Sequence, residues 1–156
     1  MLFAEYGHNI LVAHERKTRL TLLARLPNRK ADPTARALAC LVEPWPEAMR
    51  ETITFDNGTE FARHYRLTQQ LGIETYFCDP RSPWQKGGVE NAIGRLRRDL
   101  PRKTDLAKLS TRDILAIASR YNNTPRKCLD YKTPAEACLA PLLHFECEST
   151  SQLSLG

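Results

Sequence analysis

Short β-rich segments separated by helix patterns constrain the fold of this chain more than any other feature of its sequence. Residues 9–26 are typical of a β-hairpin, because an apolar run at 10–13 and an alternating run at 20–26 flank a polar turn. Residues 52–55 and 73–78 are further β-rich runs, and they end at Asp-Asn-Gly and Asp-Pro turn signals. Strands interleaved with helices predict an α/β fold built on a mixed sheet.

Helix patterns fill the segments between and after these strands. The first helix is predicted to start with Asp32 as N-cap and Pro33 at its first position, and to run to about Glu43. The second covers residues 61–71 and ends at Gly72. The third follows a loop that ends in two glycines, and Pro101 ends it. We expect its apolar residues to face the core; they are Val89, Ile93, Leu96 and Leu100.

Two more helices are predicted downstream. One starts near Ser110 and carries Ile114, Leu115 and Ala118 toward Tyr121. The other opens at Thr133-Pro134-Ala135-Glu136, a capping box with proline at its first helical position. We expect residues 1–140 to form one domain, and residues 141–156, which are Ser-rich and aperiodic, to be a disordered tail.

Composition excludes several classes of protein. The chain has 156 residues and 42% hydrophobic residues, which suits one globular domain. Its longest apolar run, residues 114–118, is far shorter than a membrane span, and its start does not resemble a signal peptide. The five cysteines form no CxxC pair, and their odd number argues against a disulfide framework or a zinc ribbon. We therefore expect reduced thiols in a cytoplasmic protein.

Positive charge is concentrated in one segment. The chain carries a net charge of +5, which permits a polyanionic partner without requiring one. Between residues 81 and 103 there are two acids, Glu90 and Asp99, against seven cations: Arg81, Lys86, Arg95, Arg97, Arg98, Arg102 and Lys103. This segment is therefore either a nucleic-acid-binding surface or a solvated basic face.

Two carboxylates are candidates for catalysis. Asp56 follows a β-rich run directly, and Glu90 opens the amphipathic helix, with Gly94 and Arg97 one and two turns along the same face. A residue as small as Gly94 leaves room for the backbone of a partner to approach Glu90. Each acid also has an ordinary structural interpretation, because Asp in Asp-Asn-Gly forms Asx turns and Glu in a first turn favours the helix dipole.

Asp56 and Glu90 lie in two longer motifs: residues 53–61, Ile-Thr-Phe-Asp-Asn-Gly-Thr-Glu-Phe, and residues 82–91, Ser-Pro-Trp-Gln-Lys-Gly-Gly-Val-Glu-Asn. With two further motifs, in order along residues 1–140, they resemble the bacterial insertion-sequence thirty family of DDE transposases, in which the first is similar to the second-aspartate motif and the second to the glutamate motif. Asp56 and Glu90 are 34 positions apart, close to the family's spacing of about 35. Residues 14–19 resemble the family's first hairpin turn, and residues 121–137 its terminal signature.

The resemblance implies a ribonuclease-H-like fold, as in retroviral integrases, with a mixed sheet flanked by helices. It implies that Asp56 and Glu90 are two of three catalytic carboxylates that bind two Mg²⁺ or Mn²⁺ ions for phosphoryl transfer. Lys86, Arg95, Arg97 and Arg98 would hold the DNA backbone without reading its sequence. The implied partners are the element's terminal inverted repeats and target DNA, with the protein as a homo-oligomer in the bacterial cytoplasm, associated with the nucleoid.

The chain departs from the family pattern in three places. The family's first catalytic aspartate aligns one or two residues upstream of Met1, and the helix-turn-helix region that recognises the inverted repeats has no counterpart in these residues. Asp130 stands where the family usually has glycine in a turn. Two functions therefore stay open: a transposase core that acts when the missing aspartate is supplied, or a catalytically dead remnant that binds DNA or pairs with an intact transposase. A general ribonuclease-H-like nuclease is a third, which the terminal signature argues against.

Overall fold

The hairpin predicted at residues 9–26 forms the centre of the molecule. The computed structural model describes residues 2–3 and 9–142. Strands β2 (Asn9–His14) and β3 (Thr21–Leu26) pair antiparallel over their whole length, and β1 (Leu2–Phe3) adds to the other edge of β2 in the register Leu2↔Ile10. The hairpin prediction is therefore confirmed, and its apolar residues can be assigned to two faces.

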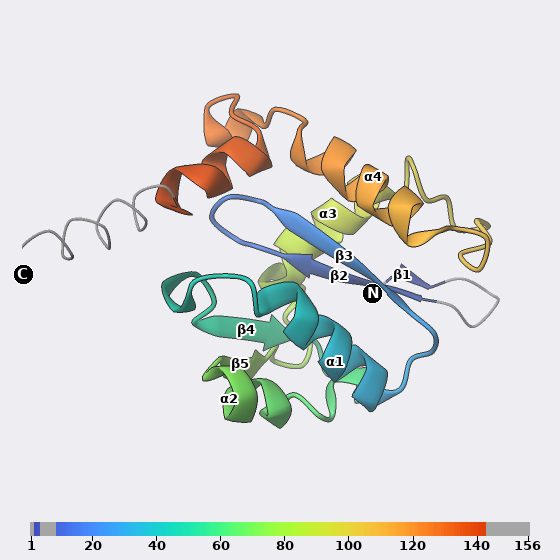
Figure 1. Ribbon diagram of the computed structural model, residues 1–156, viewed down its shortest axis with the longest axis vertical. Coiled ribbons are helices and arrows are strands. Elements are labelled where there is room, and N and C mark those ends of the chain that lie inside the picture. The colour runs from blue at the N-terminus through green and yellow to red at the C-terminus, as the bar shows by residue number, and fades with distance from the viewer. Residues whose placement is uncertain (1, 4–8, 143–156) are drawn as a thin grey trace, which may run out of the picture.

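Helices cover both faces of this three-stranded sheet (Figure 1). Ile10 and Val12 pack with α3 (Gly87–Leu96) and α4 (Thr111–Asn122), whereas Leu11 packs on the opposite side with α1 (Ala31–Val42). Because successive side chains of a strand point to opposite faces, an apolar run without alternation is what a sheet buried on both faces requires.

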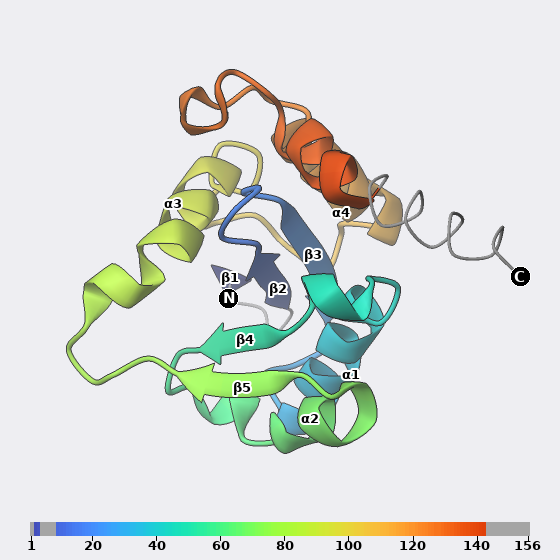
Figure 2. The same cartoon turned by 90° about the vertical axis from the view of Figure 1, so that its left-hand side faces the viewer.

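A second, parallel sheet lies beside the first. Strands β4 (Thr52–Phe55) and β5 (Glu74–Phe77) pair from Thr52↔Glu74 to Phe55↔Phe77, and η2 (Thr59–Phe61) and α2 (Tyr65–Leu71) connect them. Gly72 ends α2 with a left-handed φ of 68°, as its position predicted. In the described residues the strands form two small sheets, so the expectation of one mixed sheet is not met there; Figure 2 shows the two sheets one above the other.

The start of α1 differs from the prediction. The N-cap is Lys30, so Asp32 and Pro33 lie inside the first turn. The carboxylate of Asp32 instead forms ion pairs with Arg63 (3.2 Å) and Arg66 (2.8 Å), which tie α1 to the start of α2. Asp32 is thus satisfied by a tertiary contact, which the local sequence does not contain.

Helix α3 is displaced from its predicted bounds. The two glycines expected in a flexible loop belong to it, because η3 (Pro83–Lys86) leads directly into Gly87. The helix ends at Leu96 rather than Leu100, yet both leucines are buried, as predicted. Val89 and Ile93 pack at the margin of the same cluster.

The two downstream helix starts are confirmed. Ser110 and Asp113 form a reciprocal capping box at α4, and Thr133 and Glu136 form one at a helix over residues 134–142. The buried stripe of α4 is formed by Ile114, Ile117 and Tyr121, whereas Leu115 on the same helix is 59% exposed.

Several remaining expectations fall partly outside the described residues. The tail was predicted from residue 141, whereas the last described helix continues to residue 142, and residues 143–156 are outside the description. Of the cysteines within it, Cys78 and Cys138 are buried and Cys40 and Cys128 are exposed, all as free thiols. Asp130 ends η4 (Lys127–Leu129) with a left-handed φ of 51°, the conformation that glycine would adopt more easily. None of the helices described is both long and apolar enough for a membrane span.

Candidate catalytic and DNA-binding site

Asp56 lies at the carboxyl end of β4 in a turn that fixes its side chain. It is half-buried, and its Oδ1 accepts a hydrogen bond from the backbone N–H of Gly58 at 3.2 Å. This is the Asx turn that the structural interpretation of Asp-Asn-Gly predicted. No hydrogen bond within the described residues reaches Oδ2, so one oxygen of the carboxylate is held and the other is available.

A continuous set of hydrogen bonds connects this turn to the start of α3. The Asn57 side chain donates to the carbonyl of Cys78 at 2.9 Å, which joins the ends of β4 and β5. The next residue, Asp79, bonds twice to the Gln85 side chain in η3, at 2.7 and 2.8 Å. Figures 1 and 2 agree that α3 rises on the side to which β4 and β5 point.

Glu90 lies in the first turn of α3 and faces away from the core. The core side of the helix is formed by Ala92 and Leu96, both buried against β2. Glu90 is exposed and has no hydrogen bond or ion pair within residues 9–142. Around Gly94, one turn along, a Cβ atom would meet nothing within 4 Å. The carboxylate is therefore presented on an open helix face.

The four basic residues predicted to contact DNA differ in their surroundings. Arg95 and Arg98 are exposed, and Arg95 donates to Asn91 at 3.1 Å. Arg97 lies just beyond the end of α3, is half-buried, and donates to the carbonyl of Leu100 at 3.4 Å. Burial and the nearby Arg102 lower the pKa of Arg97. Lys86 is half-buried at the end of η3. Of these four residues, Arg95 and Arg98 are thus the most open to a partner.

Sequence reasoning missed a buried arginine next to this surface. Arg126 is 7% exposed and lies in the turn between α4 and the last described helix. Burial lowers its pKa, and Arg95 and Arg98 lower it further. The Asn-Asn-Thr-Pro-Arg run in the terminal signature contained the only signal for it, and that run reads as an ordinary turn.

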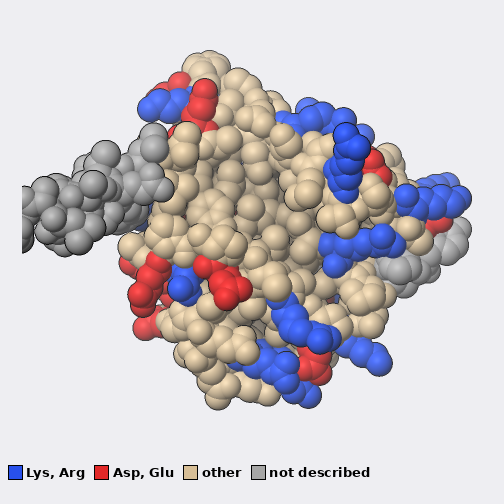
Figure 3. Space-filling view, in the orientation of Figure 1, with Lys and Arg blue, Asp and Glu red and all other residues tan. Residues whose placement is uncertain are grey.

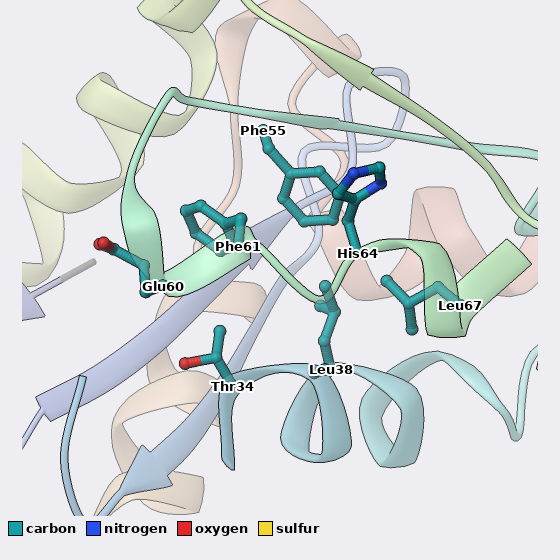
Figure 4. A pocket seen from close by; sticks show the side chains of 8 residues that line it. Thr34, Leu38, Phe55, Glu60, Phe61, His64 and Leu67 are labelled. Atoms are coloured by element: carbon teal, nitrogen blue, oxygen red, sulfur yellow. The ribbon is translucent and has the colours of Figure 1, made fainter. Parts of the chain in front are cut away.

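The resemblance implies three carboxylates around two ions, whereas the described residues do not gather three candidate ligands. No group of three His, Cys, Asp or Glu residues in the described ranges is placed to hold an ion together. The carboxylates of Glu60 and Asp56 both lie beside the point where a Cβ on Gly58 would stand. Glu60, however, is buried and forms an ion pair with Arg29 at 3.6 Å. Figure 4 shows its carboxylate directed away from the rings of Phe55 and Phe61. Glu60 therefore supports the turn and has its own cation.

Charge is distributed unevenly around the molecule. Figure 3 shows acidic side chains gathered on the left of the view, near the start of β4, and basic ones on the right. The hollow at this start, the end of the second sheet opposite to Asp56, is lined by Glu47, Glu51 and Glu74 together with Arg50. Three carboxylates against one guanidinium make that end less favourable for a polyanion than the basic side of the view.

Comparison with known proteins identifies relatives of the chain, although no family model matches it. It is 40% identical over 122 residues to the transposase InsI for insertion sequence element IS30A of Escherichia coli K12, an alignment that covers 78% of this chain and 32% of that protein. The transposase for IS1086 of Cupriavidus metallidurans is 39% identical over 78% of this chain and 36% of its own length, and that for IS4351 of Bacteroides fragilis is 35% identical over 81% and 39%. The chain thus spans about a third of the length of the relatives it matches. The motifs and these identities together show that the chain belongs to the insertion-sequence thirty (IS30) family of transposases.

Proposed function

We propose that this chain is the catalytic core of a DDE-type transposase, which cuts and joins DNA by metal-dependent phosphoryl transfer. The observation that carries the proposal is the set of hydrogen bonds from the Asp56 turn through Cys78 and Asp79 to Gln85, because Gln85 lies in η3, which leads directly into the helix that carries Glu90. A site for DNA also needs an open basic surface, and Arg95 and Arg98 supply one on and just after the helix that carries Glu90.

The pairing of β1 supports a ribonuclease-H-like fold and a place for a third carboxylate. Strand β1 pairs only with Asn9 and Ile10, so the edge of β2 from Leu11 onward has no partner among the described strands. In both Figure 1 and Figure 2, β4 lies on this side of β2, away from β3. Residues continuing β1 backwards would pair along that edge, joining the two sheets into one mixed sheet and reaching toward Asp56.

Asp56 and Glu90 are the residues that would hold Mg²⁺ or Mn²⁺. Their donor set fits, because both offer carboxylate oxygens without a partner in the described part of the chain and these ions prefer such ligands. When bound, the ions supply stabilisation of charge on the attacking and leaving oxygens of an in-line displacement. The chain itself orients the site: the Asx turn fixes Asp56, the buried stripe of α3 fixes Glu90, and Lys86, Arg95 and Arg98 hold the DNA backbone.

The proposal extends to partners, domain and location. The substrates are DNA carrying the element's terminal inverted repeats and target DNA, and the protein acts as a homo-oligomer because transposition joins two ends. Residues 1–140 form the catalytic domain, which works at bacterial DNA in the cytoplasm. A basic face that contacts phosphates gives binding that weakens steeply with salt.

Binding of Mn²⁺ tests the metal site without relying on activity. In an N-terminally extended chain that adds one aspartate to β1, Mn²⁺ should broaden the amide resonances around Asp56 and Glu90, and Asp56→Asn or Glu90→Gln should abolish the effect. Glu43→Gln is the matched control, because Glu43 is an exposed carboxylate at the end of α1 and is no part of the proposed site. Broadening that survives both test substitutions would contradict the site.

A second candidate function is DNA binding without catalysis, either alone or with an intact transposase. It is favoured by one observation: the described residues bring no third ligand to Asp56 and Glu90. The two functions separate on a duplex carrying an inverted repeat. Strand nicking that requires Mn²⁺ and Asp56 supports the first, whereas binding with a steep salt dependence and no nicking with any divalent metal supports the second.

A further inference from the structure

We propose that Arg126 is the centre of a phosphate site that holds one phosphodiester of bound DNA beside α3. The site would extend the DNA surface from α3 to the turn that follows α4. This inference rests on the DNA-binding part of the proposed function.

Arg126 is a buried cation whose charge is not balanced by an acid. Its Nη2 donates to the carbonyl of Tyr121 at 3.0 Å, and its guanidinium lies over the Tyr121 ring, 4.4 Å from the centroid. Its Nε is buried without a hydrogen-bond partner, and no carboxylate of the described residues forms an ion pair with it. Burying a charged donor in this way is costly unless an anion completes its surroundings.

Cationic groups near Arg126 come from three separate segments. Burial is the main cause that lowers the pKa of Arg126, and Arg95 and Arg98, on and just after α3, lower it further, whereas Tyr121 and Cys128 act in the opposite direction. Arg126 also acts on His14 at the end of β2, as does Arg19 in the hairpin turn. The packing brings this turn to α3, because the His14 ring and the Arg19 guanidinium lie 3.3 and 3.8 Å from the point where a Cβ on Gly88 would stand.

None of the four arginines of this cluster, Arg19, Arg95, Arg98 and Arg126, forms an ion pair with an acid in the described ranges. Elsewhere the fold does pair such groups, as with Asp32 and the two arginines that follow η2. Like charges gathered without a counter-charge repel one another, and a phosphodiester relieves this repulsion by offering two oxygens that match guanidinium donors. Arg95 lies on the helix that carries Glu90, so the phosphate site would adjoin the segment that carries this proposed catalytic carboxylate.

A structural role alone is the competing explanation. Stacking on Tyr121 and the bond to its carbonyl would by themselves fasten the turn to the end of α4, where a cation also favours the helix dipole. That role does not explain why the buried Nε has no hydrogen-bond partner. Nor does it explain why Arg95 and Arg98 lie nearby without an ion pair in the described residues. The two roles predict different responses to DNA.

The first measurement follows the Nε–H resonance of Arg126 in the full ¹⁵N-labelled chain. Its cross-peak is identified by its loss in Arg126→Lys, and the titrants are a short duplex DNA of mixed sequence and, separately, inorganic phosphate. We expect the duplex to shift the cross-peak in a saturable manner. A cross-peak that stays in place while α3 amides shift overturns the proposal, and so does a response to inorganic phosphate in a chain that binds no duplex.

The second measurement is the dependence of DNA affinity on salt. Arg126→Gln should weaken binding about tenfold and reduce the slope of log Kd against log salt by about 0.9, the contribution of one phosphate contact. Arg36→Gln is the matched control, since Arg36 is exposed on α1 at the opposite face of the sheet, and should change neither quantity. If Arg126→Gln does not fold, Arg126→Lys should keep the slope and lose affinity.

The outcomes distinguish this proposal from the function on which it rests. If Arg126→Gln lowers the melting temperature but leaves the DNA affinity and its salt slope unchanged, the role of Arg126 is structural. That result overturns the phosphate site and leaves DNA binding intact. A wild-type chain that binds no duplex at low salt would overturn both.

Discussion

The two segments that carry Asp56 and Glu90 are built in different ways. Asp56 lies in a turn crowded with hydrogen bonds, in which its own Oδ1, the Asn57 amide and the Gly58 backbone all take part. Glu90 lies on a helix face with open space around Gly94 and no side-chain bond of its own in the described residues. The first carboxylate is thus positioned by local bonding and the second by packing of the far side of its helix, so different substitutions should displace them.

The largest effect is expected from the packed side of α3. Leu96→Ala removes a fully buried side chain and should lower the free energy of unfolding by about 2–5 kcal/mol. Leu115→Ala on α4 is the control, because Leu115 is 59% exposed and its loss should change stability by less than about 0.5 kcal/mol. Urea denaturation measures both, and equal losses would show that α3 is not held by this stripe.

Filling the turn should have the next largest effect. A Cβ on Gly58 would stand 2.6 Å from Glu60 Oε2 and 3.0 Å from Asp56 Oδ1. Its φ of −73° suits any residue, so Gly58→Ala is a test of space alone, and we expect it to cost about 1–3 kcal/mol. Because Glu60 is buried and paired with Arg29, it cannot move away freely. An unchanged melting temperature would mean that the turn is looser than its bonds indicate.

Removing each carboxylate compares the two segments directly. Asp56→Ala deletes the acceptor of the Gly58 N–H and should lower the free energy of unfolding by about 1 kcal/mol. Glu90→Ala deletes an exposed group and should change it by less than about 0.5 kcal/mol. If Glu90→Ala destabilises the chain as much as Asp56→Ala does, Glu90 has a structural partner and the contrast between the segments fails.

Adding a methyl group at Gly94 should separate stability from binding. Nothing lies within 4 Å of its Cβ position, so Gly94→Ala should stabilise the helix by about 0.5–1 kcal/mol. If DNA approaches the backbone at this point, the same substitution weakens duplex affinity. A rise in melting temperature with unchanged affinity would place the DNA contact elsewhere on α3.

The sequence predicted local structure better than it predicted contacts between distant segments. Five predicted features depend on neighbouring residues and are present: the hairpin, the strand that ends just before Asp56, the Gly72 helix end, the helix start near Ser110 and the capping box at Thr133. The ion pairs of Asp32 depend on partners far along the chain, and the burial of Arg126 depends on how distant segments pack around it. The local sequence pattern contains neither.

For the candidate site, the same distinction applies. The Asx turn at Asp56 and the outward face of Glu90 follow from turn chemistry and helix periodicity. The expectation that Arg97 would share the Glu90 face failed in part, since α3 ends at Leu96 and Arg97 bonds the Leu100 carbonyl. A helix end shifts by a few residues when a following turn offers its own bonds, and periodicity does not signal that competition.

The smallest effect concerns pH and His14, which packs against Gly88 at the start of α3. Burial, Arg19 and Arg126 lower the pKa of His14 from its ordinary 6.5, against the opposing effect of Glu15. The unfolded chain therefore binds more protons than the folded chain once the pH falls through about 6.5, so folding stability declines in that window and is restored as the pH rises.

His14→Gln should reduce the fall in melting temperature between about pH 7.5 and about pH 5.5. The lowered pKa values of Glu15, Asp113 and Glu136 do not interfere, because their contributions are lost only below the ordinary carboxyl values of 4.5 and 3.8. DNA bound near Arg126 would supply the missing counter-charge and make His14 easier to protonate, so the same pH step should destabilise the DNA-bound chain less than the free chain.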